Sequence, residues 1–137
     1  MNKSLRVADY MATDLLTLTP EMELMRALAL FLEVDVSGAP VVDSEGELVG
    51  ILTERDCIRK ALHAGYYDEP GGTVESSMTS TVVTVDGSDR LMDVALRFRD
   101  SHFRRYPVVD EGRLIGLISR RDVLRAMQDG AWFSPDQ

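Results

Sequence analysis

Two acidic side chains each follow a hydroxyl residue by three positions, a spacing that suits the recognition of a sugar. The pairs are Thr53 with Asp56 and Ser119 with Asp122. Because a carboxylate accepts hydrogen bonds on both oxygens, it can bind the two neighbouring hydroxyl groups of a ribose. The same spacing is typical of a capping box at a helix start. In either case the free N–H groups of the helix also favour a phosphate nearby.

Two adjacent arginines, Arg104 and Arg105, are a second candidate for binding an anion. Guanidinium groups bind phosphate through pairs of parallel hydrogen bonds. The alternative interpretation is a solvated surface turn, in which the charges contribute little. The sequence leaves both interpretations open.

Other residues with reactive side chains favour structural roles. Cys57 is the only cysteine, which excludes a disulfide within the chain and a cysteine-rich metal site, and we expect it in the core. His63 and His102 have no partner at metal-ligand spacing and are interpreted as surface or helix-end residues. No glycine-rich phosphate loop, nucleophile–base pair or pair of close carboxylates is found. The sequence therefore predicts neither a metal site nor an enzyme.

The composition predicts a globular protein with an uneven charge. The 137 residues are 45% hydrophobic and 28% charged, and there is no apolar run long enough for a membrane span and no signal peptide, so we expect a cytoplasmic location. The formal net charge of −8 disfavours binding to nucleic acid. Residues 7–64 hold 4 basic and 11 acidic side chains, whereas residues 74–130 hold 9 of each, and all 9 bases are arginine. Any anion site should therefore depend on the second half.

The chain is an internal duplication, which decides its fold. The strand-like Pro40-Val41-Val42-Asp43 returns 67 positions later as Pro107-Val108-Val109-Asp110. After a turn that is one residue shorter in the second copy, residues 48–53 match residues 114–119. Repeat 1 is predicted over residues 1–65 and repeat 2 over 74–131. A linker at 66–73 and a C-terminal tail at 132–137 complete the chain.

Each copy reads as strand, helix, strand, strand, helix. In repeat 1 we expect a strand at 16–18 and then a helix capped by Thr19, with Pro20 in its first position. The later elements are strands at 40–42 and 48–52 and a helix at 54–64, and repeat 2 has helices at 89–100 and 120–129. One copy is too small to bury much apolar surface alone. The expected fold is therefore α+β, with two β-α-β-β-α repeats packed sheet to sheet about a pseudo-twofold axis.

This arrangement resembles the CBS domain family, named for cystathionine β-synthase. The likeness runs from about Val7 to Gly130 and is carried by the Pro-Val-Val-Asp strand, the turn glycine and a Gly-x-x-Thr/Ser-x-x-Asp tail, present as Gly50 to Asp56 and Gly116 to Asp122. The resemblance implies a tandem pair, called a Bateman module. Such modules bind AMP, ADP, ATP or S-adenosylmethionine in clefts between the repeats, dimerise into a disc and regulate a partner protein, as in energy sensing.

The resemblance also assigns roles to particular residues. Asp56 and Asp122 would bind ribose, the hydroxyls before them would bind ribose or phosphate, and the arginines would bind phosphate. The stretch 36–39 stands where repeat 2 has residues 103–106 with both arginines, and its Val36 and Ser37 would form a small neutral wall against the adenine. The stretches 12–15 and 79–82, which precede the first strand of each repeat, would meet the adenine edge. One cleft would combine Thr13, Val36, Ser37, Arg104, Arg105, Ser119 and Asp122, and the other Thr53, Asp56, Ser80, Phe103 and Arg104.

The predicted function is therefore that of a regulatory module with an adenosyl nucleotide as its ligand and no required cofactor. The cleft with both arginines has the better phosphate chemistry and should be the more occupied one. The alternative is a structural dimerisation module whose clefts no longer bind. The absence of a basic residue in the 36–39 stretch supports this alternative.

Overall fold

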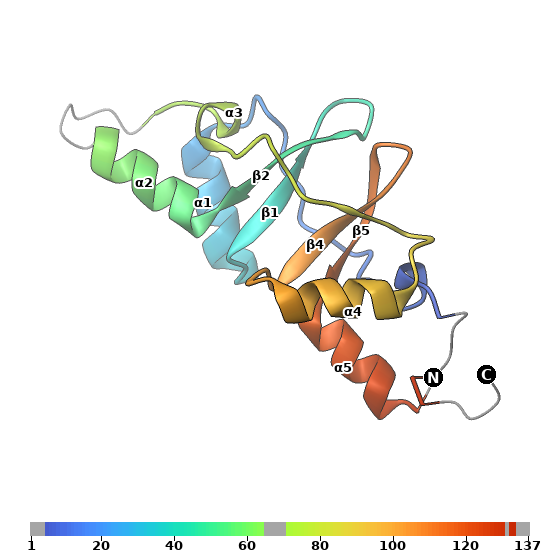
Figure 1. Ribbon diagram of the computed structural model, residues 1–137. Coiled ribbons are helices and arrows are strands. Elements are labelled where there is room, and N and C mark those ends of the chain that lie inside the picture. The colour runs from blue at the N-terminus through green and yellow to red at the C-terminus, as the bar shows by residue number, and fades with distance from the viewer. Residues whose placement is uncertain (1–4, 65–70, 131, 134–137) are drawn as a thin grey trace. The chain divides into compact units, whose positions relative to one another are not determined.

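The chain folds into two compact units in the computed structural model, which describes residues 5–64, 71–130 and 132–133 (Figure 1). Unit 1 combines Met1–Leu15 with Val83–Gln137, and unit 2 is Leu16–Val82. Each unit thus contains the strands and helices of one sequence repeat and the segment that leads into the other repeat. The boundaries predicted from the sequence follow the duplication instead, and they stay a prediction.

Unit 2 is built on the antiparallel hairpin of repeat 1. Its elements are α1 (Leu24–Val34), β1 (Gly38–Val42), β2 (Leu48–Thr53), α2 (Glu54–Ala64) and α3 (Val74–Ser77). A single parallel bridge joins Leu18 to Val41, and it replaces the three-residue strand expected at 16–18. The Leu18 N–H donates to the Pro40 carbonyl and the Val42 N–H donates back to Leu18, so this segment still holds the third place beside β1.

Unit 1 repeats this plan with a three-stranded sheet. Its elements are the 3₁₀ turn η1 (Val7–Asp9), β3 (Val85–Asp86), α4 (Leu91–Asp100), β4 (Arg105–Asp110), β5 (Arg113–Ser119) and α5 (Arg120–Gln128). Strand β3 runs parallel to β4, and β4 is antiparallel to β5. Each repeat therefore has the β-α-β-β-α order predicted from the sequence, and the α+β class is confirmed.

A lead-in segment joins the hairpin of each unit in the same way, residues 5–12 in unit 1 and residues 72–79 in unit 2. Val7 and Val74 are fully buried at equivalent positions. Ala12 then forms an antiparallel bridge to Leu117, as Thr79 does to Ile51. Each lead-in segment therefore extends its sheet edge beside the last strand of the hairpin, close to the helix that follows.

Apolar side chains from helices and strands form one core in each unit. In unit 1 the cluster contains Phe98, Tyr106, Ile118, Val123 and Trp132, among others. In unit 2 it contains Leu24, Phe31, Val41, Leu52 and Cys57, among others, which confirms the structural role expected for the cysteine. Both helices of each repeat thus bury one face against their own sheet.

The prediction for the start of the first helix was wrong. Helix α1 begins at Leu24, and Thr19 does not cap it. Residues 19–22 form a turn instead, closed by the Met22 N–H on the Thr19 carbonyl. The Pro20 carbonyl accepts from Glu75, and the Met22 carbonyl accepts from Val74. The turn is therefore used to hold the lead-in segment of unit 2.

The remaining element predictions agree with the structure to within a few residues. Helix α2 has the predicted bounds, α5 ends one residue before the predicted end, and both hairpins lie where the repeat places them. The predicted linker lies outside the described residues except for 71–73, and so does the tail after Phe133. No helix in the described part of the chain is long and apolar enough to cross a membrane. The packing of one sheet on the other stays a prediction.

Candidate functional site

In unit 1 the predicted pair Ser119 and Asp122 forms a reciprocal cap at the start of α5. The Ser119 N–H donates to Asp122 Oδ2 over 2.8 Å, and its hydroxyl lies 3.1 Å from the same oxygen. The Asp122 N–H donates in return to Ser119 Oγ over 3.2 Å. Asp122 Oδ1 lies 2.9 Å from a guanidinium nitrogen of Arg125. The carboxylate is buried, with 6% of the residue exposed, so the capping interpretation is confirmed for this pair.

In unit 2 the pair Thr53 and Asp56 has the same arrangement before α2. Asp56 Oδ2 accepts from the N–H and the hydroxyl of Thr53, both over 2.9 Å. Its Oδ1 accepts from Arg59 over 3.1 Å and from the hydroxyl of Thr79 over 3.3 Å. Asp56 is as buried as its counterpart, at 4% exposed. Capping does not exclude ligand binding, because a carboxylate has about four acceptor positions.

Cys57 follows Asp56 in the chain, and its thiol is buried. Burial raises the pKa of the Cys57 thiol, and the carboxylates of Asp56 and Glu54 raise it further. A thiol in this setting stays protonated at neutral pH and is a poor nucleophile. The structural role of Cys57 follows from both its burial and its charged neighbours.

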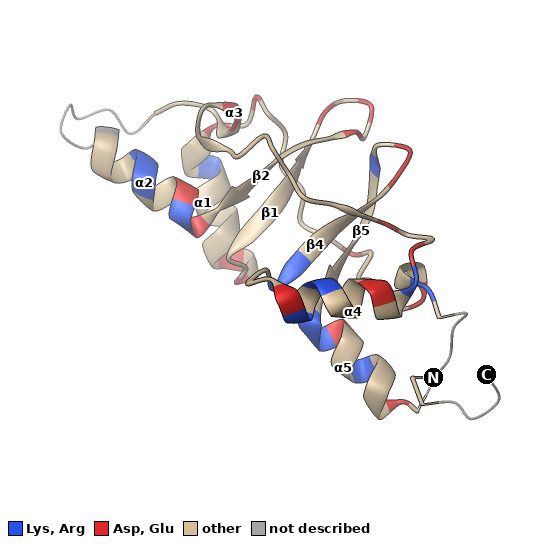
Figure 2. Cartoon of the chain, viewed as in Figure 1, with Lys and Arg blue, Asp and Glu red and all other residues tan. Residues whose placement is uncertain are grey.

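The two adjacent arginines lie next to the start of α5. Arg105 is the strand partner of Ser119 in the β4–β5 pairing, so the two side chains share one face of the hairpin. The Arg104 carbonyl accepts from the N–H of Arg120 over 3.1 Å. Both guanidinium groups are exposed, and further arginines lie on α4 and α5 (Figure 2). Unit 1 thus collects positive charge beside the buried carboxylate of Asp122.

Aromatic rings line the turn that precedes the arginines. Phe103 is 40% exposed, and its ring stacks on His102 at 5.2 Å between centroids. It also contacts the buried Tyr106 at 5.4 Å, so the ring is supported from the core. An exposed, supported ring can stack on a nucleobase.

The neutral residues predicted for the site divide between the two units. Thr13 follows the Ala12 bridge in unit 1, and Ser80 follows the Thr79 bridge in unit 2, both exposed. Ser37 is exposed, and its carbonyl accepts from the N–H of Glu54. Val36 is partly buried against the core of unit 2. These placements are compatible with the predicted roles.

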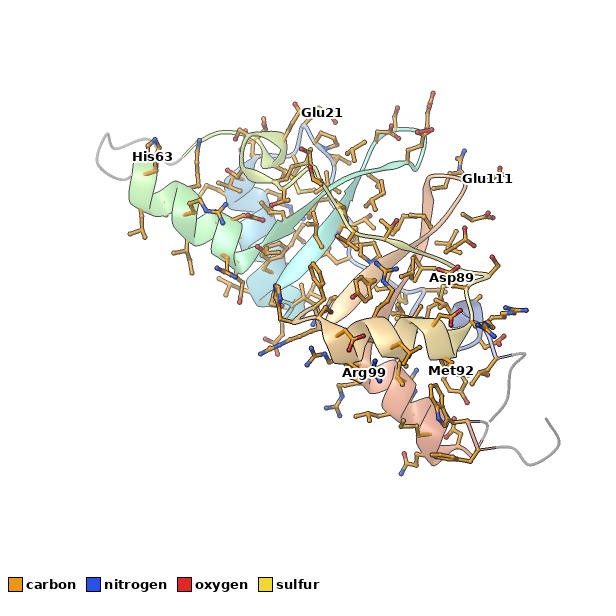
Figure 3. The ribbon with its side chains drawn as sticks, viewed as in Figure 1. Glu21, His63, Asp89, Met92, Arg99 and Glu111 are labelled. Carbon is orange, nitrogen blue, oxygen red and sulfur yellow. The ribbon has the colours of Figure 1, made fainter. Side chains whose placement is uncertain are left out.

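The predicted site residues divide between the two units, and each of the two groups is called a half-site here. Unit 1 holds Thr13, Phe103, Arg104, Arg105, Ser119 and Asp122, and unit 2 holds Val36, Ser37, Thr53, Asp56 and Ser80. The grouping of residues from both halves into shared sites stays a prediction. Figure 3 labels two residues that belong to neither half-site, His63 near the end of α2 and Glu111 on the turn between β4 and β5.

The sequence analysis missed four residues that contact the half-sites. Arg59 and Arg125 pair with the two carboxylates, and the Thr79 hydroxyl donates to Asp56. Arg120 donates to the Ser101 carbonyl in the turn before the arginines. The arginines at 59 and 125 repeat at the offset of the duplication, which was a usable signal. Nothing in the local sequence indicated the contact between Thr79 and Asp56, because 23 residues separate them.

The chain belongs to the CBS domain family, whose pattern matches residues 7–63 and 73–129. It is a tandem pair of these domains, as the duplication predicted. It is similar to the uncharacterized protein MJ1225 of Methanocaldococcus jannaschii, with 35% identity over 121 residues. That alignment covers 88% of this chain but 42% of the relative, so the chain spans less than half of that protein.

Solved structures of CBS pairs share the fold. CBSX2 from Arabidopsis thaliana is 31% identical with a TM-score of 0.80, covering 94% of this chain and 98% of that one. CBSX2 has also been crystallised in complex with AMP, where the TM-score is 0.78 over 91% of this chain and 97% of that one. The CBS pair of MJ0100, 28% identical with a TM-score of 0.72 over 90% and 96% of the two chains, was crystallised with 5′-methylthioadenosine and S-adenosyl-L-methionine. Similar CBS pairs thus bind adenosine-containing ligands.

Proposed function

We propose that this chain is a regulatory module that binds an adenosine-containing nucleotide and signals to a partner protein. The observation that carries the proposal is the buried carboxylate of Asp122, held next to Ser119, with Arg104 and Arg105 beside the same helix start. A ribose hydroxyl suits the carboxylate, and a phosphate suits the arginines and the helix N–H groups. The complexes of CBSX2 with AMP and of MJ0100 with S-adenosyl-L-methionine support this ligand class.

Each of the predicted contacts has a chemical reason in this proposal. The exposed ring of Phe103 and the small side chains of Val36, Ser37, Thr13 and Ser80 offer contacts for an adenine. Thr53 and Asp56 provide a second carboxylate of the same kind. The nucleotide acts as a regulatory ligand, and we propose no catalytic role and no cofactor. Homodimerisation and the identity of the partner protein stay predictions.

The alternative proposal is a structural dimerisation module that binds no nucleotide. It is favoured by the charge of unit 2, where the 36–39 stretch carries no basic residue. Mass spectrometry of nucleotides released from the purified protein separates the two proposals. Co-purified adenosyl nucleotide supports the sensor.

A thermal-shift series tests the ligand class and the role of the ribose together. A ligand that binds only the folded chain raises the melting temperature with its concentration. We expect AMP, ATP or S-adenosylmethionine to raise it, and 2′-deoxy-AMP to raise it less than AMP because one hydroxyl is missing. No shift with any of them at millimolar concentration would contradict the sensor. Equal shifts with AMP and 2′-deoxy-AMP would contradict the assignment of a carboxylate to the ribose.

A further inference from the structure

Asp56 and Asp122 occupy equivalent positions, but their carboxylates accept different numbers of hydrogen bonds. Asp56 accepts four hydrogen bonds, two on Oδ2 from Thr53, and two on Oδ1 from Arg59 and the hydroxyl of Thr79. Each carboxylate oxygen offers about two lone-pair positions. The acceptor capacity of Asp56 is therefore used within unit 2.

Asp122 has no counterpart of the fourth bond. Its Oδ2 accepts twice from Ser119, whereas Oδ1 lies in an ion pair with Arg125 and accepts from no hydroxyl in the described ranges. Within the described residues, one lone-pair position on Oδ1 of Asp122 is thus unused. The two carboxylates differ in what a ligand hydroxyl would have to displace.

The cause of this difference is one residue in each lead-in segment. The main chain of Thr79 exchanges two 2.9 Å hydrogen bonds with Ile51, and the main chain of Ala12 exchanges bonds of 2.8 and 2.9 Å with Leu117. Because these bridges are equivalent, the side chain at 79 has the same position relative to Asp56 as the side chain at 12 has relative to Asp122. Threonine supplies a hydroxyl there, and alanine supplies none.

We infer that the Thr79 hydroxyl occupies the ligand position on Asp56, so that a nucleotide binds through Asp122 and one molecule binds per chain. This inference rests on the proposed function, because it assumes that the carboxylate accepts from a ribose. A ligand at Asp56 must break the bond from Thr79 before it gains its own. The loss of one bond to a charged acceptor weakens binding by about tenfold or more. Thr79 and Ala12 therefore determine which half of the duplication binds.

Conservative substitutions can separate the hydroxyl from the main-chain bridge. Thr79→Val removes the donor and keeps the branched shape in an extended segment, while Thr79→Ser keeps a hydroxyl and is the matched control. Ala12→Thr introduces the hydroxyl into unit 1 at the equivalent position. Both sites are exposed, so neither change disturbs a core.

Calorimetric titration of the full chain with AMP tests the inference. We expect one site per chain in the wild type and in Thr79→Val a second site that Thr79→Ser does not show. We expect Ala12→Thr to weaken the wild-type site by about tenfold. Melting curves without AMP check that each variant is folded, and Ala12→Thr tests the inference even if Thr79→Val does not fold.

The outcomes distinguish this inference from the proposed function. Two equal sites in the wild type support the proposed function but overturn the role of Thr79. A Thr79→Val chain that still binds one AMP with unchanged affinity, together with an unaffected Ala12→Thr chain, overturns it as well. An absence of AMP binding by the wild type and by Thr79→Val overturns both proposals.

Discussion

Arg120 Nε donates a 2.9 Å hydrogen bond to the main-chain oxygen of Phe103. The same guanidinium group donates to the Ser101 carbonyl over 3.1 Å. With the main-chain bond from Arg120 to Arg104, these contacts fix the turn before β4 to the first turn of α5. In unit 2 the equivalent residue is Glu54, which has no guanidinium group to donate, and among the described residues its N–H donates to the Ser37 carbonyl over 2.9 Å.

We predict that Arg120→Met loosens this turn and weakens AMP binding through Arg104 and Arg105. Loss of the two side-chain bonds should lower the free energy of unfolding by about 1–2 kcal/mol. Arg121→Met is the matched control, because Arg121 is exposed and makes no side-chain hydrogen bond within the described residues. Urea unfolding of both variants measures the difference. Equal free energies of unfolding would show that the side-chain bonds of Arg120 do not hold the turn.

Two equivalent glycines should respond differently to alanine. A Cβ on Gly116 would lie 2.8 Å from the main-chain oxygen of Ala12 and 2.6 Å from the sulfur of Met11. The three nearest neighbours of a Cβ on Gly50 are all side-chain atoms of Met78, with the sulfur at 2.5 Å. A methionine side chain can rotate away, whereas the main-chain oxygen is fixed by the bridge to Leu117.

We therefore expect Gly116→Ala to destabilise the chain by about 1–3 kcal/mol and Gly50→Ala by clearly less. Thermal unfolding of the two variants under one condition measures the order. A larger loss for Gly50→Ala would contradict the packing described for the lead-in segments.

The last residue of β3, Asp86, has a carboxylate whose charge stabilises the fold. Asp86 Oδ1 accepts from the Ser88 N–H over 2.9 Å and from its hydroxyl over 2.7 Å. These two bonds hold the pKa of Asp86 below its ordinary value of 3.8. Because the folded pKa is lower than the unfolded one, the stabilisation is complete above the unfolded pKa and is lost as the pH falls through the folded pKa.

Ser88→Ala should raise the pKa of Asp86 toward its ordinary value, since one of the two bonds is removed. The stability difference between wild type and variant should then shrink as the pH falls below about 4. An NMR titration of the Asp86 carboxyl carbon and unfolding curves between pH 2 and 6 measure both effects. Ser76→Ala, which removes a hydroxyl bonded to the Thr73 carbonyl, should show no such pH dependence; an unchanged Asp86 titration in Ser88→Ala would contradict the assignment.

The elements that repeat and carry helical or strand patterns were predictable from the sequence. The second helix of each repeat is amphipathic and begins at a Thr/Ser-x-x-Asp cap, so α2 and α5 were placed to within one residue. The hairpins followed from alternating strands around a turn with Gly46 and Gly112, which both adopt positive φ angles of 82°. These features depend on residues close to one another in the sequence, so they can be predicted without knowledge of the tertiary contacts.

Elements defined by distant contacts were not predictable in this way. The turn at Thr19 and Pro20 has the composition of a helix start, but its carbonyls bind the lead-in segment more than 50 residues later. Helix α3 has four residues, too few for a period to show. The difference between Thr79 and Ala12 is visible in the sequence, but its meaning depends on the 3.3 Å contact to Asp56.

The most direct measurement is the affinity of the full chain for AMP when Asp122 is replaced. Asp122→Ala should weaken binding by at least about tenfold, because both the ribose acceptor and the helix cap are lost. Asp89→Ala is the control. Asp89 also accepts a hydrogen bond from a main-chain N–H of unit 1, that of Asp86, but it is not one of the half-site residues. Calorimetry should give wild-type affinity for Asp89→Ala and a tenfold or larger loss for Asp122→Ala. Equal affinities for AMP in the wild type and in Asp122→Ala would contradict the account.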